Sequence, residues 1–314
     1  MTNIEKIAQL RAEIDRVIKP LITGDCHLTN LPYHTNIGDA LIWNGSRAFL
    51  KGCGSKLLSE TSEHTWKDSR VKPNDIIIFN GGGNIGDIWR TNMEFFLRVV
   101  NRHHSNRIIL LPNSAWYKDE TLLLSDANIL SKHPDLHLIA RDKYSYGLMK
   151  EYFGINNIYL APDMAFYIPD SMLQKVRQIV PIENSVLYLR RIDKEFVPET
   201  SIEILGATIS DWPTMSNPSY IDKWYPHLNR TLRSINYKTL IDLVGHRCVR
   251  NRNVKIGAKF IAEYEQIVTT RLHTLILSVL IGRPVQYIDN ISKKLSSFVD
   301  TWLSELNTVR QYPV

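Results

Sequence analysis

An uninterrupted apolar strand followed at once by glycines constrains the fold of this chain more than any other feature. Asp75–Phe79 contains Ile-Ile-Ile-Phe, and the next residues read Asn-Gly-Gly-Gly-Asn. A strand with no polar face is typical of a parallel sheet covered by helices on both sides, because neither face meets water. Further strands are expected at 107–112, 136–140, 158–160, 185–189, 267–269 and 285–288, with helical patterns between them. This alternation predicts an α/β fold of doubly wound parallel sheets.

The length of the chain, 314 residues, suits two α/β domains better than one hydrophobic core. We expect an N-terminal Rossmann-like domain over 1–170 and a C-terminal one over 171–314, facing each other across a cleft. The crossover is placed at Pro169–Pro181. The last helix, Ile291–Leu306, is expected to pack back on the first domain. Asp193–Pro226 is rich in Pro, Ser and Asp, and a long loop with short strands is expected there.

The charge of the chain is mildly basic, with a formal net charge of +6. Such a balance suits an anionic substrate or contact with an anionic membrane surface. Nucleic acid is not indicated as a partner, because no basic stripe with interleaved aromatic residues and no zinc-finger spacing is present.

The cysteines and the apolar segments bear on the compartment. Cys26, Cys53 and Cys248 are widely spaced and form no CxxC pair, so neither a disulfide framework nor a structural zinc site is indicated. A reducing compartment fits best. Residues 1–20 have the 3.6-residue spacing of an amphipathic helix rather than the apolar core of a signal peptide. The sequence has no apolar run of about 18 residues, so we expect a cytoplasmic protein, with the inner face of the membrane as an alternative location.

The richest local pattern is the corner between a strand and a helix in Gln266–Leu277. Ile267–Thr269 is β-branched, and Thr270 is a good helix N-cap. Arg271 and His273 then fall in the first helical turn, where unpaired N–H groups and the helix dipole favour anions. Arginine adds a bidentate grip on phosphate or carboxylate, and histidine adds a proton donor near neutral pH. The alternative is a purely structural corner, with the histidine bonded to backbone.

Other candidate residues follow strands, where ligands bind in open α/β sheets. These are Asn36, Gly38 and Asp39 in the first loop, Gly82, Gly83 and Asn84 in the glycine segment, Arg141, and Arg190 beside Arg191. His34 is a further candidate base.

Several of these candidates also have a structural explanation. Asp39 would be a helix cap, the glycines would form only a tight turn, and Arg141 would pair with Asp142 at the surface. The glycine segment lacks the Lys-Ser/Thr of a phosphate-binding P-loop and the spacing of a dinucleotide fingerprint.

The same motifs, taken in order, resemble those of the polysaccharide pyruvyl transferases. They are Asn36-Ile37-Gly38-Asp39, Gly81-Gly82-Gly83-Asn84, Arg141-Asp142 with Ser145, Ala161-Pro162-Asp163, and Thr270-Arg271-Leu272-His273 followed by Gly282-Arg283-Pro284-Val285. The resemblance extends over about residues 32–300, and the Arg-Leu-His corner is its most specific part. It implies two Rossmann-like domains as in the GT-B glycosyltransferases. It also implies transfer of a pyruvyl unit from phosphoenolpyruvate to two sugar hydroxyls, giving a pyruvate ketal in capsule or exopolysaccharide synthesis.

The candidate residues suit this chemistry. Phosphoenolpyruvate carries a phosphate and a carboxylate, so Arg190, Arg271 and the helix start at His273 are expected to bind it in the second domain. His273 is the expected general acid. Asp39 or His34 would orient or deprotonate the sugar hydroxyls in the first domain. The remaining candidates, which are Arg141, Asn36, Gly38, Gly82, Gly83 and Asn84, are expected to bind substrate. The scheme requires neither a metal nor an organic cofactor.

Two other functions remain open at this stage. A nucleotide-sugar glycosyltransferase of the same architecture would also need arginine and a helix start for its phosphates, and a base-binding pocket would distinguish it. A non-catalytic scaffold of a glycan assembly complex would bind donor without turnover. The sequence does not identify the acceptor sugar, and a lipid-linked glycan is among the candidates.

Overall fold

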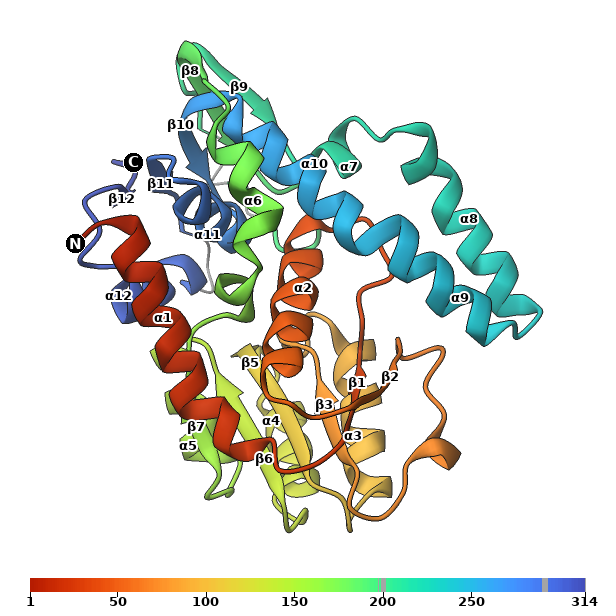
Figure 1. The fold of residues 1–314 in the computed structure, drawn as a ribbon. Helices are drawn as coiled ribbons and strands as arrows, with labels where there is room; N and C mark the ends of the chain where they lie inside the picture. Colours follow the sequence, from red (N-terminus) through yellow and green to blue (C-terminus); the bar gives the residue numbers. More distant parts are fainter. Residues whose placement is uncertain (197, 199–201, 290–292, 314) are drawn as a thin grey trace.

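The computed structural model describes residues 1–196, 198, 202–289 and 293–313, and contains two parallel sheets (Figure 1). The first sheet has the order β2-β1-β3-β5-β6-β7, with β4 beside β5. Its strands are β1 (Cys26–Thr29), β2 (Leu57–Glu60), β3 (Ile76–Phe79), β4 (Gly82–Gly86), β5 (Ile108–Trp116), β6 (Leu136–Ala140) and β7 (Ile158–Leu160). The second sheet has the order β12-β11-β10-β8-β9. Its strands are β8 (Ile182–Leu189), β9 (Ala207–Ser210), β10 (Tyr264–Thr269), β11 (Val285–Tyr287) and β12 (Val309–Gln311).

Both sheets reverse their strand order at one point. In the first sheet β1 lies between β2 and β3, and in the second β8 lies between β9 and β10. Loops that leave neighbouring strands in opposite directions open a crevice at such a point. The crevices lie at the carboxyl ends of β1 and β3 and of β8 and β10, so the loops after these four strands are the ones that can hold a ligand.

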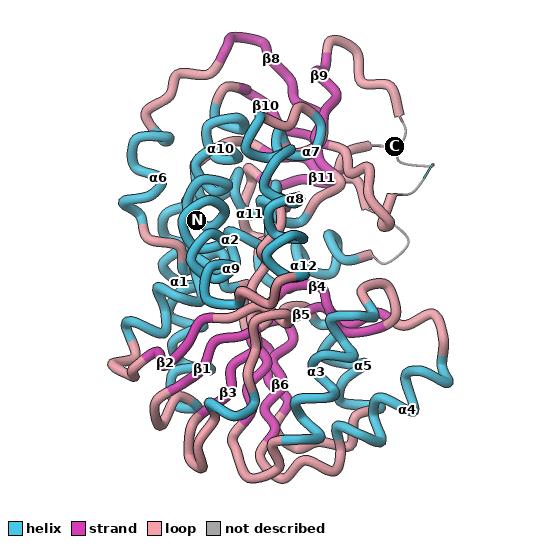
Figure 2. The backbone as a smooth tube through the Cα atoms, turned by 90° about the vertical axis from the view of Figure 1, so that its right-hand side faces the viewer, coloured by secondary structure: helices cyan, strands magenta, loops and turns pink. Residues whose placement is uncertain are grey.

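Helices surround the two sheets, and most of them lie against a sheet face. They are α1 (Asn3–Ile18), α2 (Ile37–Gly52), α3 (Arg90–Arg102), α4 (Glu120–Leu130), α5 (Lys143–Tyr152), α6 (Asp170–Arg177), α7 (Pro213–Ser216), α8 (Tyr220–Ser234), α9 (Lys238–Gly245), α10 (Asn251–Ala262), α11 (Leu272–Ile281) and α12 (Lys294–Trp302). Short helical turns are η1 (Lys19–Leu21), η2 (Asp68–Arg70), η3 (Met164–Tyr167) and η5 (His246–Arg250). Figure 2 shows α3, α4 and α5 together on one side of the first sheet, where their apolar side chains form one core cluster with that sheet.

A larger core cluster joins the two halves of the molecule. It contains Leu28 and Ile109 from the first sheet and Leu187 and Ile267 from the second, together with apolar residues of the helices between them. The helices α2 and α10 approach closely at Gly257, where an added Cβ would lie 2.5 Å from Ile37. The sheets are therefore packed against a common layer of helices.

The predicted α/β class and parallel sheets are confirmed, and every strand expected from an apolar run is present. Two local predictions were wrong, the second in part. The glycine segment is not only a turn, because Gly82–Gly86 pairs with β5 as strand β4. The segment Asp193–Pro226 contains the expected loop and the short strand β9, but it also holds α7 and the start of α8, which were not expected.

The C-terminal helix contacts the first half of the chain. Its described part is α12, and the start expected at Ile291 lies outside the described residues. The indole Nε1 of Trp302 donates to the Arg141 carbonyl at 2.7 Å, and the hydroxyl of Ser297 accepts from the Tyr144 N–H at 3.3 Å. The two sheets lie on either side of the boundary expected at 170/171, and the division into domains stays a prediction.

Candidate active site

The loops at the two strand-order reversals line one cleft of about 470 Å³. From the first half come residues that follow β1 and β3, among them His34, Asn36, Asp39, Gly83 and Asn84, with Arg141 after β6. From the second half come Arg191, Asp193, Glu195, Arg271, His273 and Lys294. Residues predicted from four separate strand ends thus meet at one place.

His273 lies where the two halves touch. Its ring packs against Gly38 in the first turn of α2, where an added Cβ would lie 2.5 Å from His273 Nδ1. Its Nε2 lies 3.5 Å from Asp163 Oδ2, which is ion-pair distance but outside hydrogen-bond geometry. The glycine in the Asn-x-Gly-Asp loop is therefore required by the space that the histidine ring occupies.

Asp163 is a fully buried carboxylate between the halves. Arg141 Nη1 donates to its Oδ2 at 2.8 Å, and the Ala165 N–H donates to its Oδ1 at 2.8 Å. Burial alone would raise the pKa of Asp163, but His273, Arg141 and the Ala165 N–H together hold that pKa below its ordinary value. A negative charge therefore remains fixed beside His273 and orients its ring.

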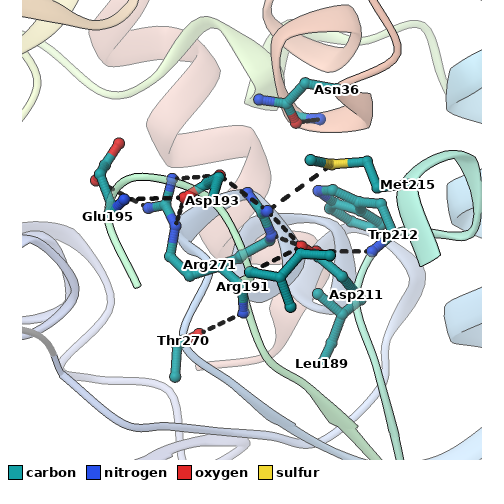
Figure 3. Close-up of polar contacts among 12 residues, drawn as sticks. Asn36, Leu189, Arg191, Asp193, Glu195, Asp211, Trp212, Met215, Thr270 and Arg271 are labelled. Carbon is teal, nitrogen blue, oxygen red and sulfur yellow. Dashed lines mark hydrogen bonds and ion pairs between the residues drawn. The ribbon is translucent and has the colours of Figure 1, made fainter. Parts of the chain in front are cut away.

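Arg271 is buried and bound by two carboxylates (Figure 3). Its Nη2 donates to Asp211 Oδ2 at 2.7 Å and to Asp193 Oδ2 at 3.0 Å, and its Nε also donates to Asp211. Asp211 in turn accepts from the backbone N–H groups of Ile192 and Trp212. The guanidinium is thus held rigidly at the floor of the cleft.

Arg191 begins a second chain of ion pairs. It donates to Asp193 Oδ1 at 2.8 Å and to Glu195 Oε2 at 2.8 Å. Glu195 also accepts from Lys294 Nζ at 3.1 Å and from the indole of Trp89 at 3.1 Å. Because Trp89 belongs to the first half of the chain, this network crosses the cleft.

The cations of the network are balanced by acids. Burial alone would raise the pKa of Glu195, but Lys294 and Arg191 outweigh it and lower that pKa to about 2. Burial lowers the pKa of Lys294, and Glu195 offsets this only in part. An anionic ligand would therefore compete with carboxylates for guanidinium and ammonium groups that are already in place.

The first loop is organised by Asn36 rather than by Asp39. Asn36 is the N-cap of α2, and its Oδ1 accepts from the Gly38 N–H at 3.1 Å. Asp39 accepts from Asn36 Nδ2 at 2.8 Å and lies 3.6 Å from His34 Nε2. The explanation of Asp39 as a helix cap is therefore wrong, and its partly exposed carboxylate faces the cleft beside a histidine.

The glycine strand brings backbone close to two cations. An added Cβ on Gly83 would lie 3.4 Å from Arg141 Nη2 and 3.9 Å from Lys294 Nζ. Gly82 has a φ of +147°, which side chains rarely adopt. The N–H of Asn84 donates to Asn113 Oδ1 at 2.8 Å. Gly83 therefore leaves the arginine and the lysine open to the cleft.

The structure places Arg191 rather than Arg190 in the cleft. Successive side chains of a strand point to opposite faces. The Arg190 guanidinium lies 5.7 Å from the ring of Phe196, and within the described residues it is not part of the cleft lining.

The prediction that Thr270 caps α11 is also wrong, because the Thr270 hydroxyl accepts from the Arg191 N–H at 3.0 Å. Arg271 occupies the cap position of α11 without a side-chain cap bond.

Sequence reasoning did not select several residues of the network. These are Arg191, Asp193, Glu195, Asp211 and Lys294. Only Arg191 gave a signal, as the neighbour of Arg190. In the described part of the chain no group of three or more His, Cys, Asp or Glu side chains is arranged to hold a metal, so we assign no metal-binding residues.

Comparison with known proteins agrees with the motifs. The family model described as polysaccharide pyruvyl transferase matches residues 36–292. The chain therefore belongs to the polysaccharide pyruvyl transferase family and is a transferase, which confirms the resemblance drawn from the sequence.

Individual relatives carry the same name. The chain is 30% identical over 286 residues to the putative pyruvyl transferase EpsO of Bacillus subtilis, covering 89% of this chain and 85% of that protein. It is 27% identical to pyruvyl transferase 1 of Schizosaccharomyces pombe, covering 88% of this chain and 69% of that protein. A crystal structure of a functionally uncharacterized Klebsiella pneumoniae protein superposes with a TM-score of 0.65 at 17% identity. That structure covers 97% of this chain and 99% of its own and supports the fold alone.

Proposed function

We propose that this enzyme transfers a pyruvyl unit from phosphoenolpyruvate to two hydroxyls of one sugar and so forms a pyruvate ketal. The observation that carries the proposal is the convergence of Arg141, Arg191, Arg271, Lys294 and His273 on one cleft. A donor with a phosphate and a carboxylate needs several cations within a few ångströms, and a proton donor beside them.

The donor is proposed to bind at the second sheet. The first turn of α11 presents backbone N–H groups with no side-chain cap at Arg271, which favours an anion there. Arg191 and Lys294 would exchange their bonds to Asp193 and Glu195 for bonds to the donor. Such an exchange keeps every cation paired, so the free enzyme does not hold unpaired buried charge.

The chemical steps use His273 as the proton carrier. It protonates the methylene carbon of phosphoenolpyruvate, and one sugar hydroxyl attacks the adjacent carbon, returning its proton to the imidazole. The second hydroxyl then displaces the phosphate, which leaves with the second proton. Asp163 orients the ring throughout, and the arginines stabilise charge on the phosphate. The steps call for no metal and no organic cofactor.

The acceptor is proposed to bind at the loops of the first half. Tyr33, His34 and Asp39 line the cleft there, together with Glu63 and His64 from the loop after β2. Hydroxyl and carboxylate groups of this kind suit a sugar, and Asp39 with His34 would orient the sugar hydroxyls through hydrogen bonds. The proposed setting is exopolysaccharide or capsule synthesis in the cytoplasm, with a free or lipid-linked glycan. The shared strand order of the two sheets supports a GT-B architecture.

The test is incubation of the protein with phosphoenolpyruvate and a panel of model and lipid-linked glycosides. We expect phosphate release in equal amount to a pyruvylated product, measured by mass spectrometry. Matched incubations with nucleotide sugars serve as the control. Glycosyl transfer from a nucleotide sugar, or donor binding without turnover on every acceptor, would contradict the proposal.

A further inference from the structure

Helix α8 has one broad apolar face, and one edge of that face is not covered. Its inner face consists of Asp222, Tyr225, Asn229 and Leu232, which are buried. Ile221, Trp224 and, at the C-cap, Ile235 are exposed along one edge of this face and are called the α8 stripe, whereas Leu228 between them is partly buried and packs against the core. Figure 1 shows α8 as the outermost helix of its side of the molecule, beyond α9. The stripe therefore lies at the surface, beside the covered face.

The stripe and the apolar residues near it are strongly exposed. Trp224 is 51% exposed, Ile235 62% and Tyr220 80%. Tyr237 and Leu243, at the start and on the outer side of α9, are also exposed. Scattered single apolar residues are normal on a surface, but exposed apolar side chains gathered on one helix and its ends, with a tryptophan and two tyrosines, mark an interaction site.

The segment that carries the stripe is basic, although Arg233 lines the cleft and Lys238 donates to the Trp66 carbonyl. Residues 220–250 contain six Lys or Arg residues, namely Lys223, Arg230, Arg233, Lys238, Arg247 and Arg250, and two aspartates. Both aspartates are engaged. Asp222 accepts from Arg252 at 2.6 Å, and Asp242 accepts from the Tyr33 hydroxyl at 3.0 Å. A tenth of the chain thus carries a large part of its net charge of +6.

We infer that the α8 stripe, with its flanking Lys223 and Arg230, docks on an anionic lipid surface. An amphipathic helix with basic side chains beside Trp, Tyr and Ile is the pattern that lies in a membrane interface. Basic residues near such a surface add attraction to anionic headgroups. A second copy of the chain fits less well, because two strongly basic segments would face each other. Among the described residues, no helix is long and apolar enough to span a bilayer, so the contact is peripheral.

The same helix borders the active-site cleft. Asn229 on its inner face donates to the Tyr33 carbonyl at 3.3 Å, and Arg233 lines the cleft. Docking of the stripe therefore holds the cleft close to the membrane. On the proposed function this favours acceptor sugars attached to a lipid, and this last step alone depends on that function.

The experiment is co-sedimentation of the full chain with phosphatidylcholine vesicles that contain or lack phosphatidylglycerol. We expect binding only to the anionic vesicles, weakened by salt. Trp224→Ala should lower the binding constant by roughly tenfold. The double variant Lys223→Gln, Arg230→Gln should lower it by tenfold or more, because each basic residue contributes about fivefold.

Matched controls are Leu124→Ala, at a residue 52% exposed on α4, and Lys132→Gln at an exposed lysine beside the same helix. Both should bind as the unaltered protein does. Equal binding to both vesicle types, or equal loss in the controls, would overturn the inference. A dimer that is detected by sedimentation equilibrium and dissociated by Trp224→Ala would also overturn it. Turnover with a soluble acceptor should be unchanged in Trp224→Ala, so failure of the membrane contact and failure of the proposed chemistry are separable.

Discussion

At the scale of single residues, the proton chemistry assigned to His273 can be separated from its part in binding. Glutamine can donate a hydrogen bond but cannot titrate. We predict that His273→Gln lowers turnover by roughly 10²–10⁴-fold. Donor affinity should fall much less, because Arg191, Arg271 and the α11 N–H groups remain. Steady-state kinetics and calorimetry with phosphoenolpyruvate measure the two effects.

His273→Ala is the control, and it should be as inactive as His273→Gln. The pH–rate profile of either variant should lose one limb. Near-normal turnover in His273→Gln would remove the histidine from the proton transfer, and His34 would then be the residue to test.

Arg271 is expected to act on stability as strongly as on binding. Its removal leaves Asp211 buried without its cation, a change that typically costs about 3–5 kcal/mol. We predict that Arg271→Ala lowers the free energy of unfolding by that amount, measured by urea denaturation. In the double variant Arg271→Ala, Asp211→Ala the loss should be smaller than the two single losses added together. Additive losses would show that the pair is not coupled.

At the scale of elements, the contact between α2 and α11 depends on a glycine. A methyl group on Gly38 would collide with the His273 ring. We predict that Gly38→Ala displaces the imidazole and lowers turnover by roughly 10²-fold while the chain still folds.

Gly147 in α5 is the matched control, because an added Cβ there meets no atom within 4 Å. Gly147→Ala should keep full activity and gain roughly 0.5–1 kcal/mol of stability from its helical position. Circular dichroism and kinetics on both variants test this. Normal turnover in Gly38→Ala would show that the ring has room to move.

The elements that sequence could predict are those set by local pattern. Ile-Ile-Ile-Phe in β3 has one structural explanation in a protein of this composition, because no face of the strand is polar. Strand β4 could not be predicted, since its glycine-rich residues are held by pairing with β5. Helix α8 was not predicted, because Pro226 lies inside it. The capping box of Ser219 and Asp222 was nevertheless a usable signal for its start.

The site was predictable only in part, because the cation Lys294 and the acids Asp193, Glu195 and Asp211 gave no local signal. Arg271 and His273 stand out because they share one corner of the chain. The partner of Arg271 is Asp211, 60 residues away, and no local pattern links the two. The sequence could not decide which of Arg190 and Arg191 faces the cleft. That depends on the orientation of β8, which is set by the register of the whole sheet.

At the scale of the whole molecule, carboxylates that join the two halves make stability depend on pH. The folded-state pKa values of Asp163 and Glu195 are lowered, that of Glu195 to about 2. The folded state therefore favours the ionised forms. Their contribution is complete above the ordinary values of 3.8 and 4.5, and it is lost as the pH falls through the folded-state values.

We predict that the free energy of unfolding decreases between about pH 4.5 and pH 2, measured by denaturant titration at each pH. The variants Asp163→Asn and Glu195→Gln should be less stable at pH 7 and less sensitive to acid. Asp300→Asn, at an exposed carboxylate, is the control and should follow the unaltered protein. An identical acid dependence in all four proteins would contradict the prediction.

The apolar cluster that unites both sheets also limits how the enzyme can move. Separating the halves would pull α10 from α2 at the Gly257–Ile37 contact and expose side chains that are now fully buried. At roughly 25 cal/mol for each Å² of apolar surface, a wide opening would be costly. We therefore expect the floor of the cleft to be rigid and substrates to enter through a mouth of nearly constant shape. Water is then expelled only when donor and acceptor together fill the cleft. With a truncated acceptor, water should remain in the cleft and hydrolyse the donor.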